Sequence, residues 1–505
     1  MYKILKEINQ KTDEQVDSQS AYLESLKAYV EQSNLANGKN QSYFIQTFGC
    51  QQNENDSEMI AGILEEVGFI KAADYETADI SVVNTCSIRE NADTRLFGHL
   101  GMLKRLKSEN PSRITLLCGC MMTQDQHVEK IKKSFSFVNL IFGPHDIYRL
   151  PKLLWDSIGS NQKIIAVSKK NHMVEQEKLP ISRSRKFRAL VSIMYGCDNF
   201  CTFCIVPYTR GREASRSFSA ILDEVKSLID DGYTEIMLLG QNVNAWGKDF
   251  RGIVEGPRNF AQLLEALAHF KELKRIRYMS PNPRDIDQEL IDIIGKYHNI
   301  EPHMHLPLQS GSDAILKAMR RRHDRARYLD IVKRLKQARP GISLTTDIIV
   351  GFPGESEADF LDTLDVMEQV RFDSAFTFIY SPRQGTPAAE YTNQVDQAVV
   401  EERFGRLTDL QNSHSLAANK KIVGQVEEVL LEGVSHGDPN TLTGRTADFK
   451  LINLKIDDSI KKELPQEAFT KDGLNGDYFE GKYCLVKMIK AKTFSIEGEL
   501  VSFVC

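Results

Sequence analysis

The order of apolar and polar positions divides the chain into stretches with different periods. Between residues 41 and 155, short apolar runs that predict strands alternate with amphipathic segments that predict helices. The predicted strands are YFIQTF, DISVVNT, RITLLC and VNLIFG, and one predicted helix lies around SEMIAGILEEV. Because strands that are separated by helices usually pair in parallel, this stretch predicts a doubly wound α/β domain.

The alternation of strands and helices resumes over residues 188–415. The six predicted strands are ALVSIM, TEIMLLG, RIRYMS, HMHLPL, SLTTDIIVG and AFTFIY. Helical patterns such as FSAILDEVKSLIDDG follow them. Six successive strand–helix units predict a full or partial β/α barrel of the TIM type.

The remaining segments have neither of these patterns. Residues 416–505 contain short strands joined by Gly, Asp and Asn turns, which predicts a small antiparallel β-barrel. Residues 1–40 are polar with a few helically spaced apolar positions, and we expect a peripheral extension. Residues 156–187 are polar and end in SRSRKFR, which predicts a linker.

Composition limits the classes of function. The 505 residues are 41% apolar and 26% charged with a net charge of −5, so any nucleic-acid contact must come from local basic patches. We find no apolar run of the roughly 18 residues that a membrane span needs, and the first residues are charged, so we expect a cytoplasmic protein. Nine cysteines, unevenly spaced, are typical of metal or redox chemistry rather than of disulfides.

The strongest chemical signal is GCDNFCTFC, in which Cys197, Cys201 and Cys204 form a CxxxCxxC array after the predicted strand ALVSIM. Three thiolates can each bind one iron of a cubane cluster and leave the fourth iron open for a small molecule. Such spacing also occurs by chance and in zinc sites. The position at the end of a first barrel strand, where barrel enzymes build active sites, favours a catalytic cluster.

These residues and their surroundings resemble a known family. The array, the flanking IVPYTRGREASR, and the segments LLGQNVN, HLPLQSGSDAILKAM and TTDIIVGFPGE resemble the radical S-adenosylmethionine (SAM) methylthiotransferases along nearly the whole chain. The resemblance implies a 4Fe-4S cluster whose open iron binds SAM and splits it to a radical. No side chain is then needed as a catalytic acid or base, because the cofactors carry the chemistry.

Three further cysteines, Cys50, Cys86 and Cys120, each follow a predicted parallel strand. They could be buried small hydrophobic residues, a common fate of free cysteine. The resemblance implies instead that they bind a second, auxiliary 4Fe-4S cluster. Cys118 departs from the family pattern; we expect it inside a strand, although an exchange of roles with Cys120 stays open. We expect structural roles for the other two cysteines, Cys484 and Cys505.

Contacts with SAM and with the substrate follow only from the resemblance. The residues implied to hold SAM are Gln241, Asn242, Ser310, Asp347, Gly351 and Glu355. The turn at Gly351 is equally a tight connection between strand and helix. The candidates for RNA or substrate contact are Arg210, Arg212, Arg320, Arg321, Phe376, Phe378 and Tyr380. For the arginines the alternative is a solvated surface, and for the aromatic residues it is barrel packing.

The resemblance also implies the reaction. LLGQNVN and FDSAFTFIYSPRQGTPAA are most similar to the branch that methylthiolates N6-isopentenyladenosine at position 37 of tRNA, although SPNPRDID departs from it. Residues 416–505 resemble the TRAM domain of RNA-modifying enzymes. The expected partners are tRNA, a reductant such as flavodoxin or ferredoxin, and a sulfur or iron–sulfur carrier, with the chain itself a monomer.

Two groups of alternatives remain. Other methylthiotransferases act on threonylcarbamoyladenosine in tRNA or on an aspartate of a ribosomal protein. A different class is a non-catalytic iron–sulfur protein that binds RNA or carries electrons. The motifs HExxH, GxxxxGK[ST] and GxGxxG do not occur, which weakens hydrolase, kinase and dehydrogenase interpretations.

Overall fold

A computed structural model describes residues 19–87, 92–160, 163–168, 179–252, 256–435 and 437–504. The chain forms two compact units, which we describe separately. The first comprises Met1–Ser184, Met194–Asp198 and Cys204–Arg216, and the second comprises Arg185–Ile193, Asn199–Phe203 and Ser217–Cys505. The expectations for residues 1–18, for parts of the linker (161–162 and 169–178) and for Cys505 lie outside the described residues.

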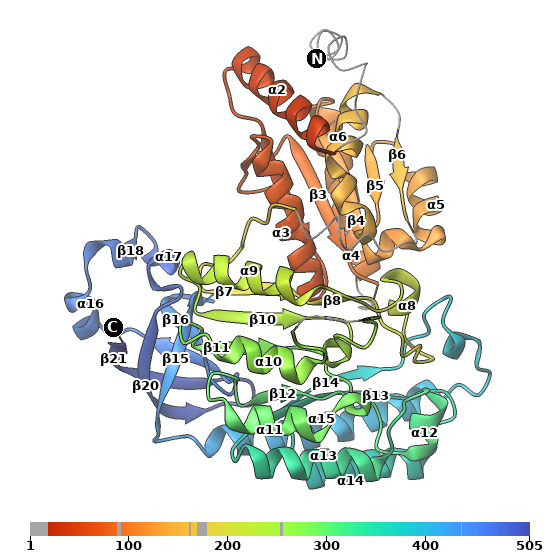
Figure 1. Cartoon of the computed structure of the whole chain (residues 1–505), viewed down its shortest axis with the longest axis vertical. Helices are drawn as coiled ribbons and strands as arrows, with labels where there is room; N and C mark the ends of the chain where they lie inside the picture. Colours follow the sequence, from red (N-terminus) through yellow and green to blue (C-terminus); the bar gives the residue numbers. More distant parts are fainter. Residues whose placement is uncertain are drawn as a thin grey trace. The chain divides into compact units, whose positions relative to one another are not determined.

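The first unit contains a six-stranded sheet in the order β2-β1-β3-β4-β5-β6, and every neighbouring pair is parallel (Figure 1). Its strands are β1 (Ser42–Thr47), β2 (Ile70–Lys71), β3 (Ile80–Thr85), β4 (Ile114–Gly119), β5 (Leu140–Phe142) and β6 (Ile164–Ala166). The four predicted strands are β1, β3, β4 and β5, so the doubly wound domain is confirmed.

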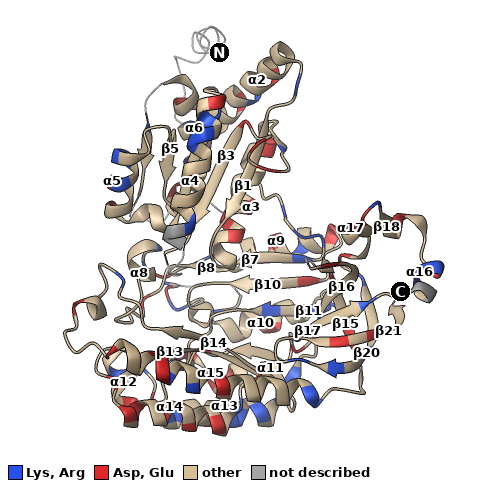
Figure 2. Ribbon diagram, turned by 180° about the vertical axis from the view of Figure 1, so that it is seen from behind, with Lys and Arg blue, Asp and Glu red and all other residues tan. Residues whose placement is uncertain are grey.

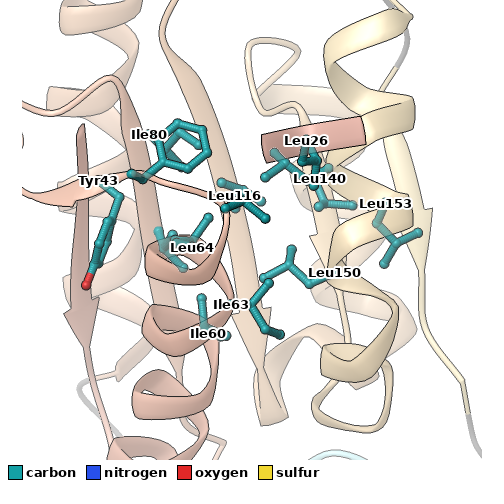
Figure 3. Packing of buried hydrophobic residues seen from close by; sticks show 14 of the residues in the cluster. Leu26, Tyr43, Ile60, Ile63, Leu64, Ile80, Leu116, Leu140, Leu150 and Leu153 are labelled. Carbon is teal, nitrogen blue, oxygen red and sulfur yellow. The ribbon is translucent and has the colours of Figure 1, made fainter. Parts of the chain in front are cut away.

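Helices pack on both faces of this sheet through two separate cores. One core joins α2 (Gln19–Asn37), α3 (Gln51–Glu66) and α6 (Leu150–Gly159) to the strands, and Figure 3 shows its leucines and isoleucines interdigitating. The other core joins α4 (Ala92–Glu109) and α5 (Asp125–Ser134) to the opposite face. Successive residues of β4 alternate between the two, since Leu116 belongs to the first core and Leu117 to the second.

Two segments of this unit differ from expectation. Leu26, Tyr29 and Val30 of α2 are buried in the first core, so residues 19–37 are part of the domain rather than a peripheral extension. Residues 164–166, expected in the linker, form the edge strand β6. The run KIIAV that contains β6 is too short to stand out among its polar neighbours.

The second unit begins with six strands that match the six predicted ones. Five parallel pairs or bridges connect them in the order β7-β10-β11-β12-β13-β14, with Ile276 and Ile300 bridging the two halves. The strands are β7 (Arg188–Ser192), β10 (Glu235–Leu239), β11 (Arg275–Tyr278), β12 (His303–His305), β13 (Ser343–Val350) and β14 (Ser374–Ile379). The partial barrel is therefore confirmed.

Helices follow these strands, and Ser, Asn or Asp side chains cap their starts. The helices are α9 (Phe218–Asp230), α10 (Phe260–Ala268), α11 (Gln288–Lys296), α12 (Asp313–Ala318), α13 (Arg325–Ala338), α14 (Glu357–Val370) and α15 (Gln397–Lys420). At the start of α14, the Ser356 hydroxyl accepts from Asp359 N–H while the Asp359 carboxylate accepts from Ser356 N–H. Figure 2 shows acidic and basic residues interspersed along α13 and α14, as on a solvated surface.

The C-terminal strands form a five-stranded barrel in the order β15-β16-β17-β21-β20, in which β20 pairs back with β15. They are β15 (Val426–Ser435), β16 (Asp438–Thr446), β17 (Leu451–Lys455), β20 (Tyr483–Ala491) and β21 (Ile496–Val504). The expected antiparallel pairing holds except between β17 and β21, which are parallel. Cys484 is buried in this barrel, as expected.

Buried charges connect the C-terminal barrel to the first strands of the partial barrel. The Arg277 guanidinium donates to the carbonyl oxygens of Thr446 and Ala447 and pairs with Glu301 at 2.9 Å. Burial raises the pKa of Glu301 to about 7, although the nearby arginines oppose this shift. In the part of the chain that the structure describes, no helix is long and apolar enough to cross a membrane.

Candidate cluster-binding sites

The three upstream cysteines lie at the carboxyl ends of three neighbouring strands of the first unit. Cys50 precedes α3 and follows β1, Cys86 follows β3, and Cys120 follows β4 and begins the 3-10 turn η1 (Cys120–Thr123). Because β1, β3 and β4 are adjacent and parallel, their ends meet at one edge of the sheet. The position predicted for these cysteines is thus confirmed; their role as ligands remains a prediction.

Buried amides and glycines fix the loops that carry these cysteines. Asn53 donates to Asn84 Oδ1 at 3.1 Å, and Asn84 donates to the Asn53 carbonyl oxygen at 2.8 Å, so the start of α3 is tied to the end of β3. At Gly119, φ is +98°, and a Cβ atom there would collide with the carbonyl oxygen of Thr85. Only glycine fits this close approach next to Cys120.

A buried arginine contacts one of the three thiols. Arg210 ends the short helix α8 (Val206–Thr209), and its Nε donates to Cys120 Sγ at 3.0 Å. Its Nη2 donates to Asp56 Oδ2 at 2.6 Å. Burial disfavours the charged guanidinium, but Asp56 and the Cys120 thiol hold its pKa above the ordinary value. With 3% of its side chain exposed, Arg210 is not placed to contact RNA as predicted.

Cys118 and Cys120 differ in their surroundings. Cys118 lies inside β4 and packs in the core beneath the sheet, and its carbonyl oxygen accepts a hydrogen bond from Thr85. Cys120 lies beyond the strand, beside Arg210. Burial raises the pKa of the Cys118 thiol well above its usual range, and it raises that of Cys120 to about 12, an effect that the Arg210 charge opposes. This placement favours Cys120 over Cys118 as a ligand.

The described residues also provide no site for a single metal ion. Among the described residues, no group of three Cys, His, Asp or Glu side chains converges as the ligands of one metal ion do. In a cubane cluster each thiolate binds a different iron, so the thiols stand further apart.

The CxxxCxxC segment is framed in the first unit by a short antiparallel ribbon. β8 (Met194–Tyr195) pairs with β9 (Ala214–Ser215), and the Cys197 N–H donates to the Gly211 carbonyl oxygen at 3.1 Å. Cys197 is buried and Cys204 is half-buried. In the second unit, Cys201 is buried, and its Sγ accepts from Arg321 Nη1 at 3.6 Å. Arg321 was predicted to contact RNA; its donation to Cys201 and to the Pro307 carbonyl oxygen places it beside the segment instead.

Most of the residues predicted to hold SAM make hydrogen bonds within the protein. Ser310 is fully buried, and its hydroxyl contacts Thr363 Oγ1 at 3.3 Å. Glu355 accepts from the Gly351 N–H and pairs with Arg403 at 3.1 Å, while burial raises its pKa.

The side chains of Ser310 and Glu355 therefore shape the loops after β12 and β13, and their contact with SAM stays a prediction. Asn242 is buried and donates to Asp285, while Gln241 is half-buried.

Asp347, a predicted SAM contact, lies on β13, next to the strand β14 that carries the predicted substrate contacts Phe376 and Phe378. The Asp347 carboxylate lies 3.3 Å from His305 Nε2. The His305 and Phe376 rings form a T-shaped pair with their centroids 5.8 Å apart. In the register of β13 and β14, Asp347 is opposite Phe376 and Ile349 is opposite Phe378. Phe376 and Phe378 are 57% and 48% exposed, which is unusual for phenylalanine in the middle of a strand.

The remaining predicted contacts with RNA or substrate lie elsewhere in the chain. Tyr380 packs against Phe352 in a small core rather than in the open. Arg212 is exposed and pairs with Asp198 at 2.9 Å. Arg320 is exposed with φ of +55°, at the turn after α12.

Sequence reasoning missed Asn53, Asp56 and Asn84, and it gave Arg210 a different role. Asn53 and Asp56 lie in CQQNENDSE, where their regular spacing from Cys50 along a helix was the available signal. Asn84 lies two residues before Cys86. Uncharged and acidic residues that follow a candidate ligand at helical spacing are candidates for supporting it.

Two known protein families match separate parts of the chain. Residues 191–367 match the profile described as Radical SAM superfamily, and residues 42–143 match the one described as Uncharacterized protein family UPF0004. A solved structure of the radical SAM methyltransferase TsrM from Kitasatospora setae, with cobalamin and a [4Fe-4S] cluster bound, shares the fold. Its TM-score is 0.52 at 14% identity, covering 69% of this chain and 77% of that one.

Curated relatives match nearly the whole length. The tRNA-2-methylthio-N6-dimethylallyladenosine synthase of Alkaliphilus oremlandii is 45% identical over 97% of this chain and 97% of its own. Proteins of the same name from Clostridium botulinum strain Okra and Thermoanaerobacter pseudethanolicus are 46% and 44% identical, over 90% and 92% of this chain and 96% and 94% of theirs. The chain therefore belongs to the radical SAM family of tRNA-2-methylthio-N6-dimethylallyladenosine synthases.

Proposed function

We propose that this protein converts N6-isopentenyladenosine (N6-dimethylallyladenosine) at position 37 of tRNA to its 2-methylthio derivative, with SAM as both methyl donor and radical source. The observation that carries the proposal is the match to synthases of this name along 97% of the chain. The two sets of three cysteines supply what the reaction needs, because each leaves one iron of a cluster open.

In this proposal the two cysteine sets have separate tasks. Cys197, Cys201 and Cys204 bind the cluster that cleaves SAM, and Cys50, Cys86 and Cys120 bind the auxiliary cluster that holds the sulfur. When bound, the clusters and SAM supply the electron, the methyl group and the radical. The protein itself fixes the ligand loops through Asn53, Asn84 and Gly119.

The six residues predicted to hold SAM fall into two groups, one that contacts SAM directly and one that acts through the loops. In this proposal Gln241 and Asp347, which are half-buried, bind SAM directly. Asn242, Ser310, Gly351 and Glu355 act on SAM by holding the loops in shape.

We further propose five segments: an N-terminal extension (1–40), which is not peripheral because α2 packs in the first core, an auxiliary-cluster domain (41–155), a linker (156–187), the radical SAM domain (188–415) and a TRAM domain (416–505). The extension and linker contribute α2 and β6 to the fold of the first unit. The working enzyme is a cytoplasmic monomer. A flavodoxin- or ferredoxin-like reductant and a sulfur or iron–sulfur carrier serve it.

The substrate preference is testable. Burying a branched five-carbon group contributes about 1.5 to 3 kcal/mol, or roughly ten- to a hundredfold in binding. We therefore expect tRNA with isopentenyladenosine to be methylthiolated at least about tenfold more efficiently (kcat/KM) than the same tRNA with plain adenosine. Nucleoside mass spectrometry of timed reactions measures both rates. Equal rates, or product only on threonylcarbamoyl-modified tRNA, would contradict the assignment to this branch.

Variants of the exposed phenylalanines locate the preference. Phe376→Ala and Phe378→Ala should each reduce the ratio of the two rates, because these side chains offer apolar surface beside Asp347. Leu361→Ala is the matched control, since Leu361 is also 48% exposed but lies on α14. It should leave the ratio unchanged.

A further inference from the structure

The sequence did not predict the contact between the Arg210 guanidinium and the Cys120 sulfur. A guanidinium lies 3.0 Å from a ligand sulfur and 2.6 Å from a carboxylate, and the side chains of Arg210 and Asp56 are 3% and 2% exposed. Charged groups this deeply buried are costly unless each is paired. Asp56 provides one partner, and the sulfur of Cys120 provides the other.

The loop and helix that carry this pair are both firmly held. The Arg210 N–H donates to the Val206 carbonyl oxygen at 2.7 Å, which fixes the backbone at the end of α8. Asp56 lies in the buried face of α3, and its Oδ1 accepts from Gln52 Nε2 at 3.4 Å. The guanidinium therefore cannot turn away to solvent, and its charge acts on the sulfur in a region from which water is excluded.

A fixed positive charge beside a ligand sulfur has a defined electronic effect. Reducing a 4Fe-4S cluster adds one electron, and part of the added charge resides on the sulfurs. An N–H donor and a cation at a sulfur stabilise this reduced state, so they raise the reduction potential. A buried carboxylate near the same sulfur has the opposite effect, because its negative charge disfavours further negative charge.

We propose that Arg210 and Asp56 form a positioning pair that sets the reduction potential of the auxiliary cluster, with Arg210 raising it and Asp56 lowering it. This inference rests on the proposed assignment of Cys120 as an auxiliary-cluster ligand. Arg210 acts through the Cys120 sulfur and need not touch tRNA or SAM.

The test uses the full chain with Cys197, Cys201 and Cys204 replaced by alanine, so that any cluster signal comes from the auxiliary site. Anaerobic potentiometric titration with dithionite, followed by electron paramagnetic resonance, gives the ratio of reduced to oxidised cluster at a fixed potential. Arg210→Gln should lower this ratio at least about tenfold, which corresponds to about 59 mV for one electron. Asp56→Asn should raise it, and Arg210→Lys, which keeps the charge, should change it less than Arg210→Gln.

The controls separate an electronic role from a structural one. Arg183, whose side chain is 10% exposed, pairs with Glu58 of α3 at 3.2 Å, so Arg183→Gln removes another arginine that pairs with this helix and should leave the ratio unchanged. If Arg210→Gln loses the cluster, the ratios of reduced to oxidised cluster in Asp56→Asn and Arg210→Lys still test the proposed electronic role.

An unchanged ratio in Asp56→Asn, or shifts in the same direction for Asp56→Asn and Arg210→Gln, would overturn the proposal. If the protein in which Cys197, Cys201 and Cys204 are replaced by alanine contains no iron, the proposed auxiliary cluster itself is wrong.

Discussion

Replacing Cys120 with alanine should abolish methylthio transfer while leaving SAM cleavage intact. Cys120 lies in the loop after β4 beside Arg210, and the proposed function assigns the cysteines of the CxxxCxxC segment to a separate ligand set. The variant should hold about four irons instead of about eight, as expected when one of two 4Fe-4S clusters is lost. Iron analysis, release of 5'-deoxyadenosine and formation of methylthiolated nucleoside measure the three effects independently.

Cys118→Ala is the matched control for that variant. Cys118 packs in the core and lies inside β4, so its loss removes only a sulfur atom from apolar contacts. We expect about 1 to 2 kcal/mol of lost stability, with both clusters and most of the activity retained. If Cys120→Ala keeps the auxiliary cluster and Cys118→Ala loses it, then Cys118 is the ligand and Cys120 is the packing residue.

Replacing Cys197, Cys201 and Cys204 together should remove the other cluster and all SAM cleavage. The protein should again keep about four irons, because Cys50, Cys86 and Cys120 bind theirs through different loops. Release of 5'-deoxyadenosine should fall to the level of a reaction without protein. Iron that stays at about eight per chain would show that these cysteines do not hold a cluster, and the two-cluster proposal would be wrong.

The arrangement of the ligand loops could be predicted because it depends on local patterns. Each of Cys50, Cys86 and Cys120 follows an apolar run that can only be a strand, and parallel strands bring their carboxyl ends to one edge. The same reasoning placed Asp347 and Phe376 on neighbouring strands. Long apolar runs and regular helices leave few alternatives for the pairing of such strands.

Features that depend on distant residues could not be predicted in this way. The partner of Arg210 is Asp56, 154 positions away, and nothing in the sequence around Arg210 distinguishes a buried arginine from an exposed one. The sequence of β16 does not look like a strand, because Pro439, Asn440 and Gly444 suggest turns. Gly444 is nevertheless required inside this strand, since a Cβ atom there would lie 2.6 Å from the carbonyl oxygen of Leu430.

The burial of the basic candidates for RNA contact could not be predicted, because charge alone does not show where a side chain lies. Arg210 and Arg321 were grouped with Arg212 and Arg320 as basic residues, yet the first two donate to cysteine sulfurs and the last two are exposed. A buried arginine needs a specific anionic partner, and such a partner is defined only by the folded chain.

The most direct test of the proposed function is mass spectrometry of tRNA nucleosides from cells that lack this protein. We expect 2-methylthio-N6-isopentenyladenosine to disappear and N6-isopentenyladenosine to accumulate. A gene for the intact protein should restore the methylthiolated nucleoside, whereas the Cys120→Ala gene should not. Persistence of 2-methylthio-N6-isopentenyladenosine at its normal level in cells without the protein would contradict the proposed function.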